Sequence, residues 1–178
     1  NVTVSIRNLV NEVAGTGGVV SLGSGVMVNL TSFNNTNGTL TASASSTVTA
    51  IGAVTTGGLG AAKRFGNLTL TSTSASLSGA LDVASTVTVS GDADIALADP
   101  VATANLTVTG SGSSVTQGAT ATILATGNLT LAANTTFTTF GNATVRIAGN
   151  VLIDAAASIP TLGANPLELN GDDAAQAV

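Results

Sequence analysis

Three similar five-residue segments decide between two folds for this chain: Ala104-Asn105-Leu106-Thr107-Val108, Gly127-Asn128-Leu129-Thr130-Leu131 and Gly149-Asn150-Val151-Leu152-Ile153. Apolar side chains occupy the third and fifth positions of each segment, which is typical of a half-buried β-strand. The segments begin 23 and 22 residues apart, close to the length of one coil of a parallel β-solenoid. This register therefore favours a solenoid.

A second spacing in the same part of the chain favours a different all-β fold. From Asn67 onwards, candidate strands start near residues 67, 80, 92, 105 and 118. Steps of 12 to 13 residues, with turn-forming residues between the strands, suit antiparallel hairpins in a β-sandwich or jelly roll. We predict the antiparallel sandwich and keep the parallel β-solenoid as the alternative.

Apolar and polar residues alternate from the first residues of the chain onward. Val2, Val4 and Ile6 alternate with polar residues, so they would share one face of a strand, and a glycine-rich hinge follows. An alternating strand at a free end can add to the sheet of another molecule, which is called β-augmentation. We therefore predict two parts: a protruding N-terminal donor strand and hinge, residues 1–14, and a single β domain, residues 15–178.

The composition excludes most catalytic chemistry. The chain of 178 residues has no Cys, His, Trp or Tyr, and only 7% of its residues are charged. Without imidazole or thiol groups, it lacks the usual general bases, nucleophiles and soft metal ligands. A carbohydrate-processing enzyme would need paired carboxylates across a groove, for which the only candidates are Asp92, Asp94, Asp99 and Asp154. We therefore predict no enzyme, no catalytic residues and no cofactor.

Charge and hydropathy narrow the expected partners. A net charge of −5 and a pI of about 4.1, without a basic patch, argue against binding to nucleic acid. The mean hydropathy is +0.50, yet polar residues interrupt every apolar stretch, so we predict no membrane span. The chain begins with Asn1 rather than Met, which fits either a mature exported protein without its leader or an excised fragment. We expect an extracellular, cell-surface location.

Asn-x-Thr tripeptides are more frequent than chance pairing of 15 asparagines with 29 threonines would give. The excess predicts N-glycosylation at some of them, because glycans would hydrate a surface with few charges. The alternative is that Asn opens strands and Thr points outward from them. Asn34 and Asn37, in the polar loop 34–38, are the best candidates. The nine acceptors are Asn1, Asn29, Asn34, Asn37, Asn67, Asn105, Asn128, Asn134 and Asn142.

Acidic residues give only a weak metal signal. Asp92, Asp94 and Asp99 are calcium candidates, because carboxylate oxygens are the ligands that calcium prefers. The chain lacks the EF-hand loop with its glycine and terminal glutamate. The preferred interpretation is a solvated acidic turn, so we predict no metal site.

For two other features, a pair of basic residues and the outward threonines, we prefer a structural interpretation to a functional one. Lys63-Arg64 follows a long uncharged span and is expected in an exposed loop. Threonines that alternate along neighbouring strands, such as Thr69, Thr71 and Thr88, would form outward ladders that stabilise a sheet. A flat, regular array of threonines can also bind ice, but the sequence shows no regularity over many coils.

The segment Gly66-Asn67-Leu68-Thr69-Leu70 and its relatives resemble the strand and turn units of filamentous-haemagglutinin-type adhesins. The resemblance covers about residues 66–154. It implies a right-handed parallel β-helix on a bacterial surface, and with it our alternative function, a β-solenoid segment of a secreted surface adhesin.

A second resemblance starts at the N-terminus. The alternating first strand, Ser32-Phe33 and the strand Gly38-Thr39-Leu40-Thr41 are similar to TasA-type biofilm matrix proteins and archaeal bundling pili. The resemblance implies that each subunit lends its N-terminal strand to a neighbour. Our main prediction is therefore a subunit of an extracellular filament, glycosylated and serving adhesion or biofilm, whose partners are identical subunits in a homopolymer and, through adhesion, glycans or neighbouring cells.

Overall fold

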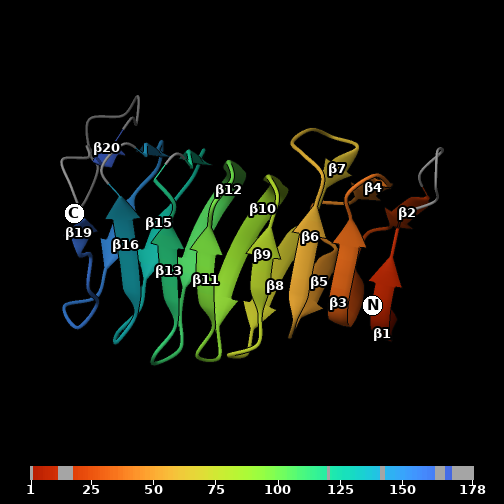
Figure 1. Cartoon of the computed structure of the whole chain (residues 1–178), viewed down its shortest axis with the longest axis horizontal. Coiled ribbons are helices and arrows are strands. Elements are labelled where there is room, and N and C mark those ends of the chain that lie inside the picture. The colour runs from red at the N-terminus through yellow and green to blue at the C-terminus, as the bar shows by residue number, and fades with distance from the viewer. Residues whose placement is uncertain (1, 12–17, 120, 141–142, 163–166, 170–178) are drawn as a thin grey trace.

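The computed structural model describes residues 2–11, 18–119, 121–140, 143–162 and 167–169. The chain winds as a β-solenoid of about seven turns, and every strand pair in these described ranges is parallel. The coils stack along the long axis of the molecule, so that the N-terminal coil lies at one end and the C-terminal coil at the other (Figure 1).

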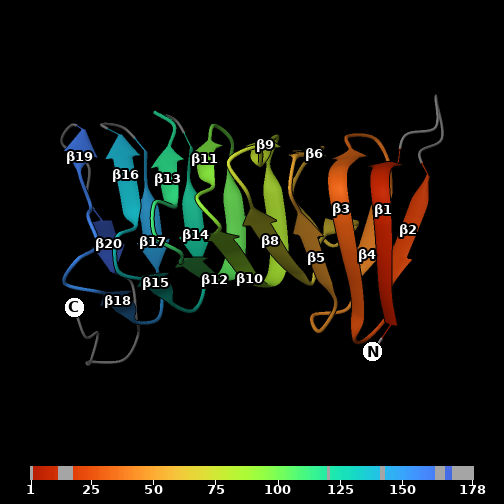
Figure 2. The same ribbon diagram turned by 90° about the horizontal axis from the view of Figure 1, so that it is seen from below.

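The coil has three sides, each made of strands that stack side by side (Figures 1 and 2). Side 1 contains β2 (Val19–Leu22), β4 (Thr39–Ala42), β7 (Lys63–Arg64), the first parts of β10 (Leu81–Ser90) and β12 (Val101–Val108), β14 (Ile123–Ala125), β17 (Val145–Ile147) and β20 (Leu167–Leu169). Side 2 contains the first parts of β1 (Val2–Val10) and β3 (Val26–Asn35), then β5 (Thr47–Ala50), β8 (Asn67–Thr71), the second parts of β10 and β12, β15 (Leu129–Leu131) and β18 (Val151–Ile153). Side 3 contains the ends of β1 and β3, then β6 (Ala53–Thr56), β9 (Ser76–Ser78), β11 (Asp94–Leu97), β13 (Ser114–Gln117), β16 (Thr136–Phe140) and β19 (Thr161–Leu162).

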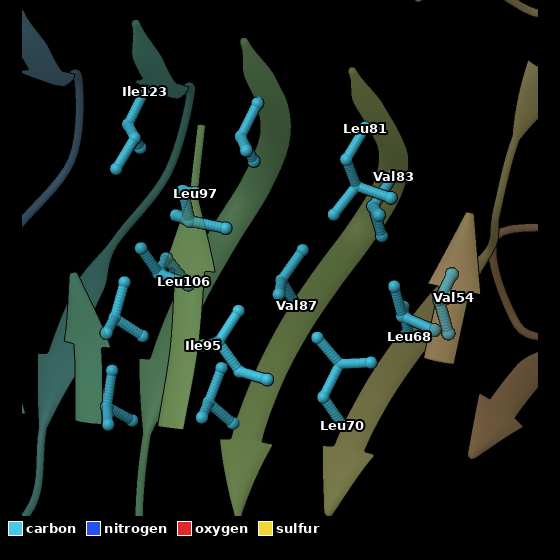
Figure 3. Packing of buried hydrophobic residues seen from close by; sticks show 14 of the residues in the cluster. Val54, Leu68, Leu70, Leu81, Val83, Val87, Ile95, Leu97, Leu106 and Ile123 are labelled. Carbon is cyan, nitrogen blue, oxygen red and sulfur yellow. The ribbon is translucent and has the colours of Figure 1, made fainter. Parts of the chain in front are cut away.

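The core is a set of apolar rows that run along the axis. Strand alternation points every second side chain inward, and in-register pairing places each one against its counterpart in the next coil. Figure 3 shows side chains from β8, β10, β11 and β12 filling the interior. The row on side 2 is almost completely buried and consists of Val28, Val48, Leu68, Val87, Leu106, Leu129 and Val151.

Three phenylalanine side chains are the bulkiest groups in this core. Phe33 and Phe65 are buried and meet edge to face, with ring centroids 5.6 Å apart. Phe137 is also fully buried. An edge-to-face pair of this kind contributes about 0.5–1.5 kcal/mol beyond the burial of its area.

The antiparallel sandwich that we predicted is wrong, and the parallel solenoid is the observed fold. The short steps between strand starts connect different sides of one coil. For example, β10 leads into β11 around a corner, while β11 pairs with β13 of the next coil. Because the chain turns a corner instead of reversing, consecutive strands do not pair as hairpins. The solenoid also includes the N-terminal coils, which the repeat in residues 66–154 did not indicate.

The prediction of a donated N-terminal strand is also wrong. β1 pairs in parallel with β3 of its own chain, with Val2 opposite Val26, Val4 opposite Val28, and Ile6 packed against the core. Physically, β1 completes the first coil, and its apolar residues find their partners one coil away. The expected hinge and the boundary at residue 14 fall within residues 12–17, outside the described residues.

Candidate functional site

Five threonines form one outward row on side 2. Alternation points them away from the core, as at Thr69, which lies between the buried Leu68 and Leu70. All five are half-buried between their neighbours. Parallel pairing sets successive members about 4.8 Å apart along the axis. The row, paired residue to residue across five coils, consists of Thr49, Thr69, Thr88, Thr107 and Thr130.

The neighbouring outward rows on side 2 are also polar and uncharged. One contains Thr47 opposite Asn67 and Thr86 opposite Asn105, and the other contains Thr71 opposite Ser90. We call the outward surface of β5, β8, the second parts of β10 and β12, and β15 the hydroxyl face. It carries no charged residue among the described residues. Side 1, by contrast, carries Arg64 and Arg146, and side 3 carries Asp94.

The hydroxyls of the central threonine row are open to a ligand. Within the described ranges, none of the five hydroxyls hydrogen-bonds to a protein group. Other buried threonines behave differently: the hydroxyl of Thr103 donates to the carbonyls of Ser85 and Asn105 at 3.2 and 2.9 Å. The row therefore presents hydroxyl and methyl groups to solvent at regular intervals.

Shallow depressions lie toward the two ends of side 2. One of about 370 Å³ covers parts of β1, β3 and β5 and includes Arg7 and Ile51. Another of about 330 Å³ lies over β15 and β18, beside Leu152 and Asp154. Both are open to solvent and neither holds converging acid and base groups.

The asparagines that open the strands of side 2 form a second ladder at the corner between sides 1 and 2. The Asn105 Oδ1 atom accepts the backbone N–H of Asn128 at 2.9 Å, and the Asn128 Oδ1 atom accepts the N–H of Asn150 at 2.8 Å. Each side chain thus satisfies a backbone donor one coil away. The Asn67 Nδ2 group donates to the carbonyls of Ala44 and Ser46 at 2.8 and 3.0 Å.

The predicted glycosylation sites fall into different environments. Asn29, Asn37 and Asn134 are exposed, on β3, in the loop before β4 and in the turn before β16. Asn34 is half-buried, and its Oδ1 atom accepts hydrogen bonds from Thr36. Asn1 and Asn142 lie outside the described residues. Occupancy by glycans stays a prediction.

Lys63 and Arg64 lie in a short strand, β7, and both are held by the fold, which differs from the exposed loop that we expected. The Lys63 ammonium donates to the backbone carbonyls of Thr36, at 2.9 Å, and of Gly38. Arg64 forms an ion pair with the buried Asp82, whose other oxygen accepts the Gly60 N–H at 2.8 Å. The hydrogen bond and the charge of Asp82 raise the pKa of Arg64. Both cations therefore brace corners of the coil.

The calcium candidates lie around β11: Asp92 in the turn before it, Asp94 as its first residue and Asp99 after it. Asp92 is exposed, Asp94 accepts a hydrogen bond from Ser114, and Asp99 accepts the Gly79 N–H at 3.1 Å. Asp154 accepts the Ala156 N–H within its own turn at 3.0 Å. The described residues contain no group of three or more potential metal-ligating side chains.

Comparisons with protein-family models, curated proteins and solved structures give no match for this chain. In the part of the chain that the structure describes, no helix is long and apolar enough to cross a membrane.

The sequence indicated only part of the threonine row. Thr69 and Thr88 were expected in ladders, whereas Thr49, Thr107 and Thr130 extend the row on both sides. The available signal was the repeated Asn-Leu-Thr in the segments at 105 and 128, which places Thr at the same position of each strand.

Proposed function

We propose that this chain is a non-enzymatic β-solenoid segment of a secreted surface adhesin, acting as a rod that displays a binding face. The observation that carries the proposal is the uninterrupted stack of about seven coils around one apolar core. On side 2, eight strand levels from β1 to β18 span roughly 34 Å at the usual strand spacing. Such a rod is suited to holding a surface at a distance from its anchor.

The placement of the charged side chains supports a structural role. Lys63, Arg64 and Asp82 are occupied by contacts that fix corners of the coil. The depressions over side 2 are shallow, and their linings contain mainly aliphatic, hydroxyl and amide groups. These groups are suited to contact with a neutral partner surface.

Exposed glycans would suit an extracellular rod. Asn37 and Asn134 present their amides to solvent, and glycans there would hydrate a surface that has few charges. Asn29 is also exposed, but it pairs with Thr49 on side 2, so a glycan there would lie beside the hydroxyl face. Asn37 is remote from the hydroxyl face, since it lies in the loop between β3 and β4. A glycan at Asn37 would therefore leave that face free.

A display experiment tests the proposal. The chain is fused to an anchor and an epitope tag on the surface of a non-adherent bacterial cell, and attachment is measured on abiotic surfaces and on cultured host cells. We expect attachment above that of cells displaying the anchor alone. A Leu68→Asp variant, which places a charge in the core, should lose attachment, whereas Thr73→Asp in an exposed turn should retain it.

Two outcomes would refute the proposed function. Cells displaying the intact chain could attach no better than cells with the anchor alone, at equal epitope staining. Alternatively, Leu68→Asp and the intact chain could attach equally well although circular dichroism shows that the variant has lost its β-structure.

A further inference from the structure

The hydroxyl face has a regular repeat along the axis, and the rows beside the threonines mix Thr, Asn and Ser. Along the axis, the five threonines of the central row recur at the strand spacing of about 4.8 Å. Across the row, outward residues two positions apart on a strand, such as Thr69 and Thr71, recur at about 6.7 Å. The axial repeat is close to a distance between oxygen atoms on the faces of hexagonal ice.

The threonines of this face are well positioned to keep such a repeat. A β-branched side chain in a strand has few allowed χ1 rotamers, so each threonine holds its methyl and hydroxyl groups in a restricted orientation. In-register parallel pairing gives every member of the row the same backbone geometry. Since no protein group engages the five hydroxyls within the described ranges, they are available to water molecules.

The chemistry of the face argues against charged extended ligands and against stacking of sugars. Without charges it offers no complement to nucleic acid, anionic lipid or a charged polysaccharide. The chain has no Trp or Tyr, and Phe33, Phe65 and Phe137 are buried, so the face offers no aromatic ring on which a sugar could stack. A neutral, flat and periodic surface of hydroxyl and methyl groups matches a neutral, periodic solid.

We infer that the hydroxyl face binds ice, the ligand being the ordered water of a crystal surface. The methyl groups restrict the orientation of the first water layer, and the hydroxyls hold water at positions that continue the lattice. Regularity in five successive coils is the observation that carries this inference, because a single threonine pair would not order a surface layer. The inference goes beyond the proposed adhesin role and does not depend on where the rod is anchored.

Observation of single ice crystals in solutions of the purified chain tests the inference. We expect a gap between melting and freezing temperatures that grows with protein concentration, together with faceted crystals. Thr88→Tyr places a bulky ring in the middle of the central row, so it should cause a several-fold loss of the gap. Thr107→Tyr, one coil away, should do the same.

Thr116→Tyr is the matched control, because Thr116 points outward on side 3, where its row contains Ala96 and Thr138. This variant should keep the full gap, and equal melting temperatures should confirm that all the variants fold. Round crystals and no gap with the wild-type chain would overturn the inference, as would equal losses in Thr88→Tyr and Thr116→Tyr. Binding of the wild-type chain to crystalline cellulose or chitin through the same face, without any effect on ice, would also overturn it and leave the adhesin role standing.

Discussion

At the scale of single residues, the recurring Gly-Asn-Leu-Thr-Leu segment has a separate physical role for each position. The glycine leaves room for the asparagine of the preceding coil: a Cβ atom at Gly149 would lie 2.5 Å from Asn128 Oδ1. Asn105 and Asn128 accept a backbone N–H of the next coil, whereas Asn67 donates to two carbonyls of the preceding coil. The two leucines enter the core, and the threonine points outward. The motif is therefore the unit that joins one coil to the next.

Gly149→Ala should destabilise the fold. Besides Asn128 Oδ1, the added Cβ atom would lie 2.6 Å from the Gly127 carbonyl oxygen, so the corner must shift or lose the ladder hydrogen bond. We expect the free energy of unfolding to fall by about 1–3 kcal/mol. Urea denaturation, monitored by circular dichroism, measures this change in the free energy of unfolding. Gly23→Ala is the control, because a Cβ atom there meets nothing within 4 Å, and it should be neutral or slightly stabilising.

The sequon environments predict which asparagines carry glycans. In protein from a glycosylating secretory host, glycopeptide mapping should show a glycan on the exposed Asn37 and none on Asn67. The Asn67 Nδ2 atom, where a glycan would attach, already donates two hydrogen bonds to the preceding coil. Full occupancy at Asn67 in folded material would contradict this prediction.

At the scale of elements, the strands could be predicted from the sequence, and their partners could not. Alternation identified the outward and inward residues of β8 and β15 correctly, because period two depends only on local backbone geometry. Pairing depends on whether a turn reverses the chain or bends it around a corner, and glycine, asparagine and serine serve both kinds of turn. β10 and β12 also pass from side 1 to side 2, with a register shift between Val83 and Thr86, so their strand starts misled the spacing analysis.

Leu106→Ala should show how much each stacked core position contributes. Leu106 is fully buried between Val87 and Leu129 of the adjacent coils, and its removal leaves a cavity that stacked strands cannot readily close. We expect a loss of about 2–5 kcal/mol of unfolding free energy in equilibrium denaturation. Leu124→Ala, at an outward position with 42% exposure, should cost much less. Equal losses at the two positions would be inconsistent with the inward and outward assignment.

Deletion of residues 1–10 should expose β3 as an edge strand. β3 pairs with β1 over most of its length, so the deletion leaves the N–H and C=O groups that face β1 unpaired and uncovers Leu30 and Phe33, while the pairing with β5 and β6 remains. We expect the shortened chain to associate in a concentration-dependent way, detected by light scattering after gel filtration. Thr31→Lys in the shortened chain should reduce the association, because a lysine on an edge opposes strand addition. A shortened chain that remained monomeric at high concentration would argue against this assignment of β1.

At the scale of the whole molecule, the variable coil length explains why the solenoid was predicted only as the alternative fold. Side 2 repeats after 19 residues between Leu68 and Val87, but after 24 between Val4 and Val28. The extra residues of the longer coils lie outside the paired strands. The paired rows therefore stay in register although the repeat length in the sequence varies. The full length of the threonine row was missed for the same reason, although Thr69 and Thr88 were expected in ladders.

Stability should be lower at the N-terminal end of the rod than in its middle. Each coil contacts only its neighbours, and β1 has one paired neighbour whereas β8 has two. In hydrogen exchange measured by mass spectrometry, amides of Asn67–Thr71 should therefore be protected longer than those of Val2–Val10. Uniform protection along the chain would indicate a single cooperative unit instead.

The nearest-neighbour construction of the rod also bears on how its gene can change. Loss or duplication of one whole coil by recombination, for example between the codons for Leu68 and Val87, would join strands whose apolar and polar rows already match. Such an event would shorten or lengthen the rod by one strand spacing, about 4.8 Å, without a new core having to evolve. Rod length is thus a trait that selection can adjust in small, equal increments.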